Sequence, residues 1–336
     1  MEAIKRLDTS KFLLLNLLLA LFLLVVCLIA LVVGPTSIGV KDLVANLFSS
    51  TGDSIVHQII FDIRLPRILF AIAVGGGLSI AGAVFQAMLM NPLAEPYILG
   101  ISSGGTFGAV LSFLLGLSFL GTQVFAFSGA ILVMLLVFVL GKRFGELEPN
   151  QLLLSGVMIG AFFSAGILLM MTLLNDSLRT AVFWLIGNLS LAEKDNLIFV
   201  LPLTLTVVVI LIVLSNKFNI LSMGSDTAKQ LGLDVSRLKN FTYVLVSVMI
   251  GTIVSVSGII GFVGLLIPHI CRMMFGNDNR IVFPASFFIG AAYLTFADTI
   301  ARTIAAPVEL PVGAITALIG APVFIYLLRK KFNIIK

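Results

Sequence analysis

The side chains in this sequence that could act in catalysis or bind a metal are few and widely separated. The 336 residues include two histidines, His57 and His269, and two cysteines, Cys27 and Cys271. A zinc-type site, or a nucleophile with its base, needs several such groups brought together, and no spacing in the chain suggests one. We therefore predict neither a catalytic site nor a bound metal, and we expect His269 to pack inside a helix.

The placement of the carboxylates bears on transport chemistry. Glu95, Asp298 and Glu309 lie at the ends of long apolar segments, whose middles carry no acid. Carriers driven by protons or sodium usually bind the coupling ion with a carboxylate inside the membrane, so an ion-coupled carrier is the less favoured interpretation. A membrane enzyme is disfavoured because no base is placed beside a nucleophile. Dependence of transport on ATP would distinguish an ATP-driven importer from an ion-coupled carrier. Turnover of a lipid without partner proteins would indicate a membrane enzyme.

The composition explains why so few reactive groups occur. Hydrophobic residues make up 59% of the chain and charged residues 11%, whereas soluble domains carry about a quarter charged residues. Long apolar runs without two-residue alternation predict spanning helices rather than barrel strands, because helices satisfy their own backbone hydrogen bonds in lipid. The sequence predicts an all-α polytopic membrane protein, with residues 1–336 forming a single transmembrane domain.

Windows of about 20 apolar residues indicate about ten transmembrane helices. The first apolar run is longer than the roughly 7–15 residues of a signal-peptide core, so we interpret it as an uncleaved span. The expected spans are 12–33, 67–89, 97–115, 122–141, 151–174, 197–215, 241–260, 262–275, 282–301 and 311–328.

Basic residues predict which ends of the spans face the cytoplasm. With the N-terminus inside, the inner segments hold 15 of the 21 Lys and Arg residues, a bias that the positive-inside rule associates with the cytoplasm. We therefore expect both termini to be cytoplasmic. The inner group consists of Lys5, Arg6, Lys11, Lys142, Arg143, Lys217, Lys229, Arg237, Lys239, Arg272, Arg280, Arg329, Lys330, Lys331 and Lys336.

Small residues recur at every fourth position on several predicted spans, a spacing that lets helices approach closely in lipid. The same stripes could line a passage with polar backbone, and both interpretations stay open at this point. The residues concerned are Gly100, Gly104, Gly108, Ser112 and Gly116 on the third span, Gly156, Gly160 and Ser164 on the fifth, and Gly313, Ala317 and Ala321 on the tenth.

Two segments suggest an internal repeat. "SIAGAVFQAMLMNP" (79–92) and "SVSGIIGFVGLLIP" (255–268) both place Ser three positions before Gly and Gly ten positions before Pro. The second span would run inward and the seventh outward, so the repeat would have inverted topology, as in many transporters.

A polar stretch, "SMGSDTAKQLGLDVSRLKN" (222–240), occupies the longest expected inner loop. Thr227 and Gln230 have the spacing of a capping box, and Asp234 can cap a second helix beyond Gly232. We expect two short helices joined by a glycine. Such a surface could rest on lipid headgroups or dock a soluble protein. Its small apolar face is expected from Ala228, Leu231 and Leu233.

This insert and three further stretches resemble the FecCD-type permeases, the membrane subunits of ATP-driven importers for ferric siderophores, haem and vitamin B12. The resemblance covers nearly the whole chain and is weakest over the first 55 residues. It implies ten helices per subunit and a fold like that of the vitamin B12 importer permease. The stretches are "RLPRILFAIAVGGGLSIAGAVFQAMLMNPLAEPYILGISSG" (64–104), "GFVGLLIPHICRMMFGNDNR" (261–280) and "ADTIARTIAAPVELPVGAITALIGAPVFIYLL" (297–328).

The resemblance also implies partners. These are a second permease subunit, with the passage at the interface lined largely by the fifth and tenth spans, two cytoplasmic ATP-binding subunits, and an extracytoplasmic substrate-binding protein. The sequence has no G-x-x-x-x-G-K-[ST] motif, so ATP and Mg would be bound by the partner ATPase and no cofactor by this chain. The residues implied to dock on the ATPase are Ser225, Asp226, Ala228, Lys229, Gln230, Leu231, Gly232 and Leu233.

For the outer face, the resemblance implies that Arg64, Arg67 and Arg302 receive carboxylates of the binding protein. Guanidinium groups suit this role because they can bind a carboxylate bidentately. Their position alone would also suit interfacial anchors at or above the membrane boundary. Asp298 lies four residues before Arg302 and could pair with it instead.

For the inner face, the resemblance implies that Asn91 and Pro92 belong to an inner gate. They open the sequence "NPLAEP" (91–96), whose two prolines by themselves indicate only a tight turn.

These features together predict the permease subunit of a binding-protein-dependent ABC importer in the inner (plasma) membrane, in contact with lipid and not itself an enzyme. The expected cargo is a metal chelate, first an iron–siderophore complex. Cobalamin and haem are the alternatives, which the sequence does not separate. No nucleic-acid partner is expected.

Overall fold

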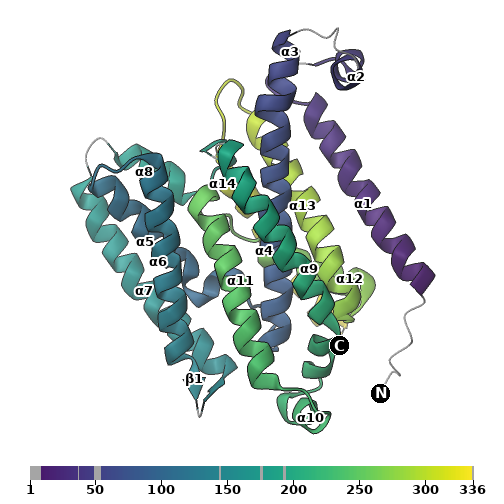
Figure 1. Ribbon diagram of the computed structural model, residues 1–336, viewed down its shortest axis with the longest axis vertical. Helices are drawn as coiled ribbons and strands as arrows, with labels where there is room; N and C mark the ends of the chain where they lie inside the picture. The colour runs from purple at the N-terminus through teal and green to yellow at the C-terminus, as the bar shows by residue number, and fades with distance from the viewer. Residues whose placement is uncertain are drawn as a thin grey trace.

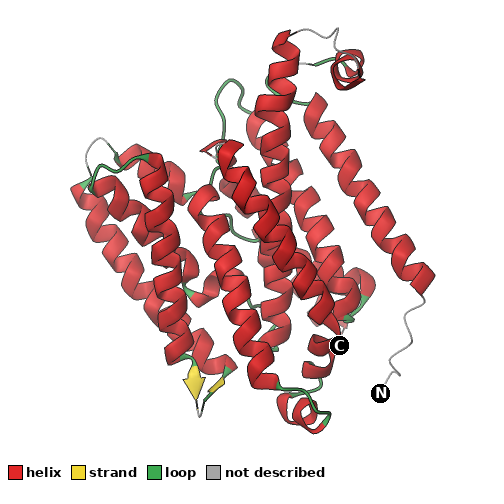
Figure 2. Cartoon of the chain, viewed as in Figure 1, coloured by secondary structure: helices red, strands yellow, loops and turns green. Residues whose placement is uncertain are grey.

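The computed structural model describes residues 9–36, 38–48, 54–143, 145–174, 177–191 and 194–334, most of which are helical (Figures 1 and 2). One two-stranded antiparallel hairpin pairs Arg143 with Glu146. The elements are α1 (Thr9–Val32), α2 (Val40–Phe48), α3 (Ser54–Gln58), the π-helical turn η1 (Ile59–Arg64), α4 (Leu65–Met88), η2 (Pro96–Leu99), α5 (Ile101–Leu114), α6 (Phe119–Leu140), β1 (Lys142–Arg143), β2 (Glu146–Leu147), α7 (Pro149–Leu173), α8 (Leu178–Leu185), η3 (Leu189–Leu191), η4 (Lys194–Asn196), α9 (Leu197–Leu221), α10 (Ser225–Gln230), α11 (Val235–Ser257), α12 (Val263–Phe275), α13 (Asn279–Thr303) and α14 (Val312–Ile334).

Within the described residues, eight helical segments are long and apolar enough to cross a membrane. They contain α1, α4, α6, α7, α9, α11, α13 and α14. The all-α multi-pass membrane fold predicted from the sequence is therefore confirmed. The third and eighth predicted spans correspond to α5 and α12, which have only 14 and 13 residues. Because a full span needs about 20 residues, ten membrane crossings stay a prediction.

Helix α4 forms the centre of the bundle and packs against α9, α12 and α13. Its small residues allow the backbones to touch. A Cβ atom at Gly75 would clash with the Gly290 carbonyl of α13, and one at Gly82 would clash with the Gly264 carbonyl of α12. Close backbone approach through small residues is the usual way in which helices pack within lipid. Gly104 and Gly108 of the stripe on the third span have the same role, because they lie against Gly129 and Phe125 of α6.

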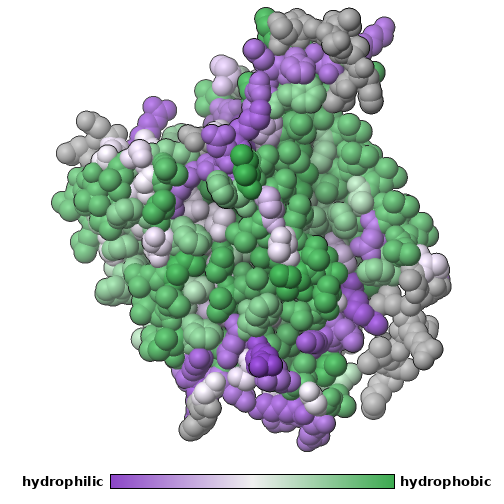
Figure 3. Space-filling model, viewed as in Figure 1, coloured by the Kyte–Doolittle hydropathy of each residue, from purple (hydrophilic) through white to green (hydrophobic). Residues whose placement is uncertain are grey.

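The two ends of the bundle carry different elements. Helices α2 and α3 project from one end, called here the α2 end, and α10 with the β hairpin lies at the other, called the α10 end (Figure 1). The start of α1 and the last turns of α14 also lie at the α10 end. On the face shown in Figure 3, hydrophobic residues cover the middle and hydrophilic ones gather towards both ends. Lys5, Arg6 and Lys336 lie outside the described residues.

The two segments of the suggested repeat have different structures. Residues 79–88 are helical, with Pro92 in the turn that follows. In the other segment, α11 ends at Ser257, residues 258–262 are not helical, and Pro268 lies inside α12. The shared spacing of Ser, Gly and Pro therefore does not mark a matched pair of elements. Gly82 of the first segment packs on Gly264 of the second, whereas Gly258 packs on the Trp184 carbonyl of α8.

Candidate functional site

Arg64, one of the three arginines predicted to face a binding protein, closes the end of α1. It is 2% exposed, and its guanidinium donates hydrogen bonds to the carbonyl oxygens of Leu31, Val32 and Thr36. Carbonyls at a helix C-terminus have no partner within the helix and need donors from elsewhere. Arg64 ends the π-helical turn η1 and supplies these donors. It is thus a cap for α1.

Arg67 and Arg302 belong to a buried charge cluster with Asp298 and Glu309. Arg67 Nε and Nη2 each donate to Asp298 Oδ1, at 3.1 and 3.0 Å, and Arg67 Nη1 donates to Glu309 Oε2 at 2.8 Å. Asp298 Oδ2 also lies 3.2 Å from Arg302 Nε. Two guanidiniums and two carboxylates therefore balance one another at the α2 end. The i, i+4 pairing of Asp298 with Arg302 that the sequence allowed is confirmed.

Both guanidiniums are buried within the protein, since Arg67 is 8% and Arg302 3% exposed. A carboxylate of a binding protein could reach these guanidiniums only by displacing Asp298 or Glu309 from them. The expected position of Arg64 and Arg67 at or above the membrane boundary stays a prediction. Glu309 is the most accessible member of the cluster, with 36% of its side chain exposed. Docking through Arg64, Arg67 and Arg302 stays a prediction. The sequence carried no signal for the pairing of Arg67 with Asp298, which lies 231 positions away.

The predicted inner gate lies in residues 89–100, called here the gate segment, which turn back into the bundle after α4. Asn91 is half-buried, and its Oδ1 accepts a hydrogen bond from the Leu93 amide at 2.9 Å, which makes the expected tight turn. Pro92 and Leu93 are exposed. Farther along, Pro96 packs directly against Gly264 of α12. The gate segment therefore contacts α12 at the point where α12 begins.

The polar insert forms α10 and the first turn of α11. Helix α10 begins after Gly224, which has φ 103° and makes no side-chain cap. The predicted capping box is wrong, because Thr227 lies inside α10 instead of preceding it. A glycine can adopt the unusual backbone angles that turn the chain sharply into this helix.

The second part of the insert follows the prediction more closely. Gly232 has φ 83° and connects α10 to α11. Asp234 caps α11, since its Oδ1 accepts a hydrogen bond from the Arg237 amide at 2.9 Å. The helix it caps is not short, however, and continues to Ser257 as a membrane-length helix.

The side chains of the insert divide into buried and exposed sets. Ala228 is fully buried and Leu233 half-buried, so only Leu231 of the expected apolar face is exposed, at 62%. Lys229 Nζ lies 2.8 Å from Glu146 Oε1 in the β hairpin, and this carboxylate raises the pKa of Lys229. The remaining exposed residues of the predicted docking set are Asp226, Gln230 and Gly232, and Ser225 is half-buried.

Three small residues of the fifth and tenth spans lie in contacts between segments of the chain, and that the set also lines a passage stays a prediction. Gly156 lies against Leu99, and Gly160 faces Gly100 at the start of α5. Gly313 of α14 packs directly on the carbonyl of Ile186, just after α8. Packing is therefore confirmed for these three glycines. Of the other two predicted residues, Ser164 is exposed and Ala317 is half-buried.

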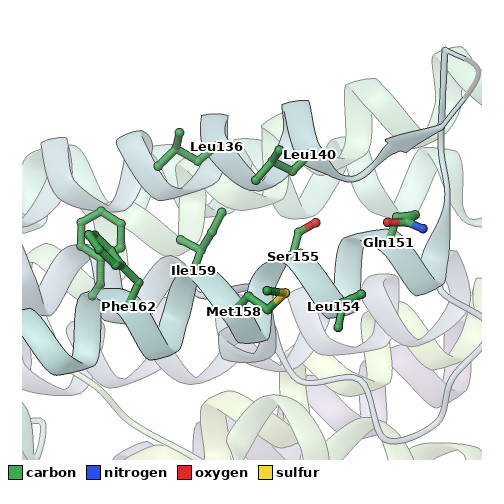
Figure 4. Close-up of a pocket in the computed structure, with 9 residues that line it drawn as sticks. Leu136, Leu140, Gln151, Leu154, Ser155, Met158, Ile159 and Phe162 are labelled. Atoms are coloured by element: carbon green, nitrogen blue, oxygen red, sulfur yellow. The ribbon is translucent and has the colours of Figure 1, made fainter.

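A cavity of about 500 Å³ lies between α6 and α7 (Figure 4). Its polar groups are Gln151 and Ser155, and no charged side chain lines it. Such a lining suits an apolar chain better than an ionic cargo. The lining consists of Leu136, Leu140, Gln151, Leu154, Ser155, Met158, Ile159, Phe162 and Phe163.

No group of three or more His, Cys, Asp or Glu side chains that could hold a metal ion occurs in the part of the chain that the structure describes. His269 is buried in α12, with its ring 5.6 Å from that of Phe324, as the sequence predicts for a packed helix residue.

Residues 22–330 match the FecCD transport family. The cobalamin import system permease protein BtuC of Halobacterium salinarum is 39% identical over 274 residues, covering 81% of this chain and 74% of that protein. The Fe(3+)-citrate import system permease protein YfmE of Bacillus subtilis is 37% identical over 318 residues, covering 93% and 94%. A solved structure described as an inward-facing metal-chelate type ABC transporter superposes with a TM-score of 0.85 and 34% identity, covering 94% of this chain and 99% of that one.

Proposed function

Because this chain belongs to the FecCD transport family, we propose that it forms the membrane passage through which an iron–siderophore complex crosses the inner (plasma) membrane. The chain is a multi-pass permease of an ABC importer. In our proposal it acts as a single transmembrane domain beside a second permease subunit. Two cytoplasmic ATP-binding subunits supply the energy, and an extracytoplasmic binding protein delivers the cargo.

The observation that best supports coupling to a separate ATPase is the exposed surface of α10. Leu231 is 62% exposed at the end of this helix and is surrounded by polar residues. Beside it, a cavity of about 610 Å³ is lined by Gly232, Leu233, Lys217 and Arg237, among others. An apolar side chain ringed by polar ones is typical of the anchor of a protein–protein interface.

The exposed apolar side chains of α7 and α14 support a contact with a second permease subunit or with lipid. Phe162 and Leu169 of α7 are 74% and 70% exposed, and Leu318 of α14 is 72% exposed. We propose that the passage lies where these two helices face the second subunit.

We place the binding protein at the α2 end. Arg67 is the arginine whose partner, Glu309, is partly accessible. A carboxylate of the binding protein that reaches Arg67 would replace Glu309 there. Both termini would then be cytoplasmic, in line with the basic residues of the inner segments and with the start of α1 and the last turns of α14, which lie at the α10 end (Figure 1).

We favour an iron chelate as the cargo, because Fe(3+)-citrate and iron(3+)-hydroxamate permeases are among the relatives that this chain resembles. Haem stays an alternative, since the hemin permease HmuU of Yersinia pestis matches 93% of this chain, as the Fe(3+)-citrate permease does. Cobalamin is the second candidate, since a cobalamin permease is 39% identical over 81% of the chain. Uptake of labelled ferric siderophore, haem and cobalamin should be compared in cells with and without the gene. We expect loss of ferric siderophore uptake only, with the same loss on ATP depletion. Uptake that stops when the ion gradient collapses, but not when ATP is depleted, would contradict the ABC mechanism.

A single substitution tests the coupling surface. Leu231→Asp places a charge on an exposed side chain, so we expect normal insertion but loss of the ATPase from the purified complex. Met274→Asp is the matched control, because Met274 is 64% exposed at the end of α12 and lies outside the insert. Retention of the ATPase by Leu231→Asp would contradict docking at α10.

A further inference from the structure

The backbone between α11 and α12 is broken inside the bundle. Residues 258–262 are not helical, and Phe262 has φ 68°, a left-handed conformation that a bulky residue rarely adopts. The break lies close to Gly82 of α4, because Gly82 packs on Gly264 just after it. Gly82 is six residues from the end of α4, which corresponds to about 9 Å along the helix. Backbone amides at this depth need partners within the protein, since lipid offers none.

Two of these amides find their partners on the gate segment. The Phe262 amide donates a hydrogen bond to Glu95 Oε1 at 3.0 Å, and the Ile260 amide donates one to the Tyr97 hydroxyl at 3.3 Å. The Glu95 carboxylate also lies at the N-terminus of α12, where the helix dipole favours a negative charge. Thus the gate segment is attached to the break by two side chains that lie two residues apart.

Helix α14 contacts the same break from its own side. A Cβ atom at Gly320 would lie 2.6 Å from the Phe262 Cβ atom, and one at Gly313 would lie 2.9 Å from the Ile259 carbonyl oxygen. Gly313 and Gly320 are seven residues apart and therefore lie on one face of α14. The helix rests on the break with no side chain of its own between them, so a displacement of α14 would push directly on Phe262.

We propose that Glu95 and Tyr97 are positioning residues that fasten the gate segment to the α11–α12 break, so that the gate segment and α14 move as one unit during transport. Without these bonds, Phe262 and Ile260 lose their acceptors and the gate segment is held only by packing. The transport part of this proposal rests on the proposed function, but the attachment itself does not.

Hydrogen exchange of the amides in the purified full chain tests the attachment. Glu95→Ala removes the acceptor, and we expect exchange at Phe262 to rise by roughly tenfold or more, which is a loss of about 1.4 kcal/mol of protection. Glu95→Gln keeps an oxygen at the same place and should stay close to the wild type. Tyr97→Phe removes only the hydroxyl and should raise exchange at Ile260. Because this last change is small, it remains informative if Glu95→Ala fails to insert.

Glu148 provides the matched control. Its Oε2 accepts a hydrogen bond from the Gln151 amide at 2.8 Å at the start of α7, so it makes the same kind of bond at the α10 end. Glu148→Ala should raise exchange at Gln151 and leave residues 258–265 unchanged. A rise at the break in this control would mean that the exchange reports general loosening, and the attachment would be overturned.

Uptake measurements separate this inference from the proposed function. We expect Glu95→Ala to lower ATP-driven uptake about tenfold and Glu95→Gln to retain it. Unchanged exchange in both Glu95→Ala and Tyr97→Phe would overturn the attachment, whatever the chain transports. Raised exchange with full uptake would overturn the joint movement with α14. If the wild type shows no ATP-driven uptake, the proposed function fails, whereas the exchange result still decides the attachment.

Discussion

At the α2 end, Arg67 and Asp298 form an ion pair at 3.0 Å with side chains 9% and 2% accessible, whereas at the α10 end Lys229 and Glu146 pair at 2.8 Å with side chains 44% and 43% accessible. The distances are similar, but the surroundings are not. A buried charge that loses its partner has no water to replace it, while an exposed charge is solvated and screened by salt. The Arg67–Asp298 pair therefore uses charge to hold helices together, whereas the Lys229–Glu146 pair leaves its charges able to exchange partners.

This difference agrees with the roles proposed for the two ends. A surface that docks a moving ATPase has to break and remake contacts at low cost. A helix junction that keeps α4 and α13 in register gains from charges that are expensive to separate.

Removing the shared carboxylate should have the largest effect. Asp298→Ala leaves Arg67 and Arg302 buried without their common partner, and we expect a loss of about 3–5 kcal/mol in the free energy of unfolding. Denaturant titration in detergent micelles measures it. A loss below about 1 kcal/mol would mean that water reaches the cluster and that its ion pairs contribute no more than exposed ion pairs do.

Removing the cap of α1 should have an intermediate effect. Arg64→Leu deprives the Leu31 and Val32 carbonyls of their donor, and leaving buried groups unsatisfied costs about 1–3 kcal/mol. Arg64→Lys should recover part of this loss, because an ammonium group can still donate hydrogen bonds but lacks the planar fork. Equal stability of Arg64→Leu and the wild type would contradict the capping role.

Glu309→Gln should lower stability less than the two substitutions above, because Glu309 is the most accessible residue of the charge cluster. Because Glu309 is partly accessible, we expect it to cost about 1 kcal/mol or less in stability. Titration with the binding protein is more informative. If docking displaces Glu309 from Arg67, the neutral amide competes less well and the affinity rises. An unchanged affinity would show that Arg67 is not a docking residue.

Lys229→Ala should leave stability unchanged within experimental error, because both partners of its ion pair are exposed. Its effect should appear in the complex instead, as weaker association with the ATPase at low salt that fades as salt is raised. A marked loss of stability in the isolated chain would mean that α10 depends on this pair, and the contrast between the two ends would fail.

Features that depend on local sequence were well predicted. The membrane class and the apolar helices follow from apolar runs of about 20 residues. Each run is by itself long and apolar enough to predict a spanning helix. The Asp234 cap and the turn at Gly232 also follow from neighbouring residues. The capping box at Thr227 failed although it is local, since a glycine conformation at Gly224 started the helix three residues earlier than a side-chain cap would have done.

Partners that lie far apart in the sequence were not predicted. Arg67 finds Asp298 across 231 positions, and the Phe262 amide finds Glu95 across 167. In lipid, every buried polar group must find a partner within the protein, but the identity of that partner depends on which helices become neighbours. The sequence alone determined that this chain is a bundle of apolar helices with a polar insert. Which charged residues pair within the bundle follows from the tertiary structure alone. Helix packing brings one partner within reach of Arg67, and the spacing of residues in the sequence does not show which partner that is.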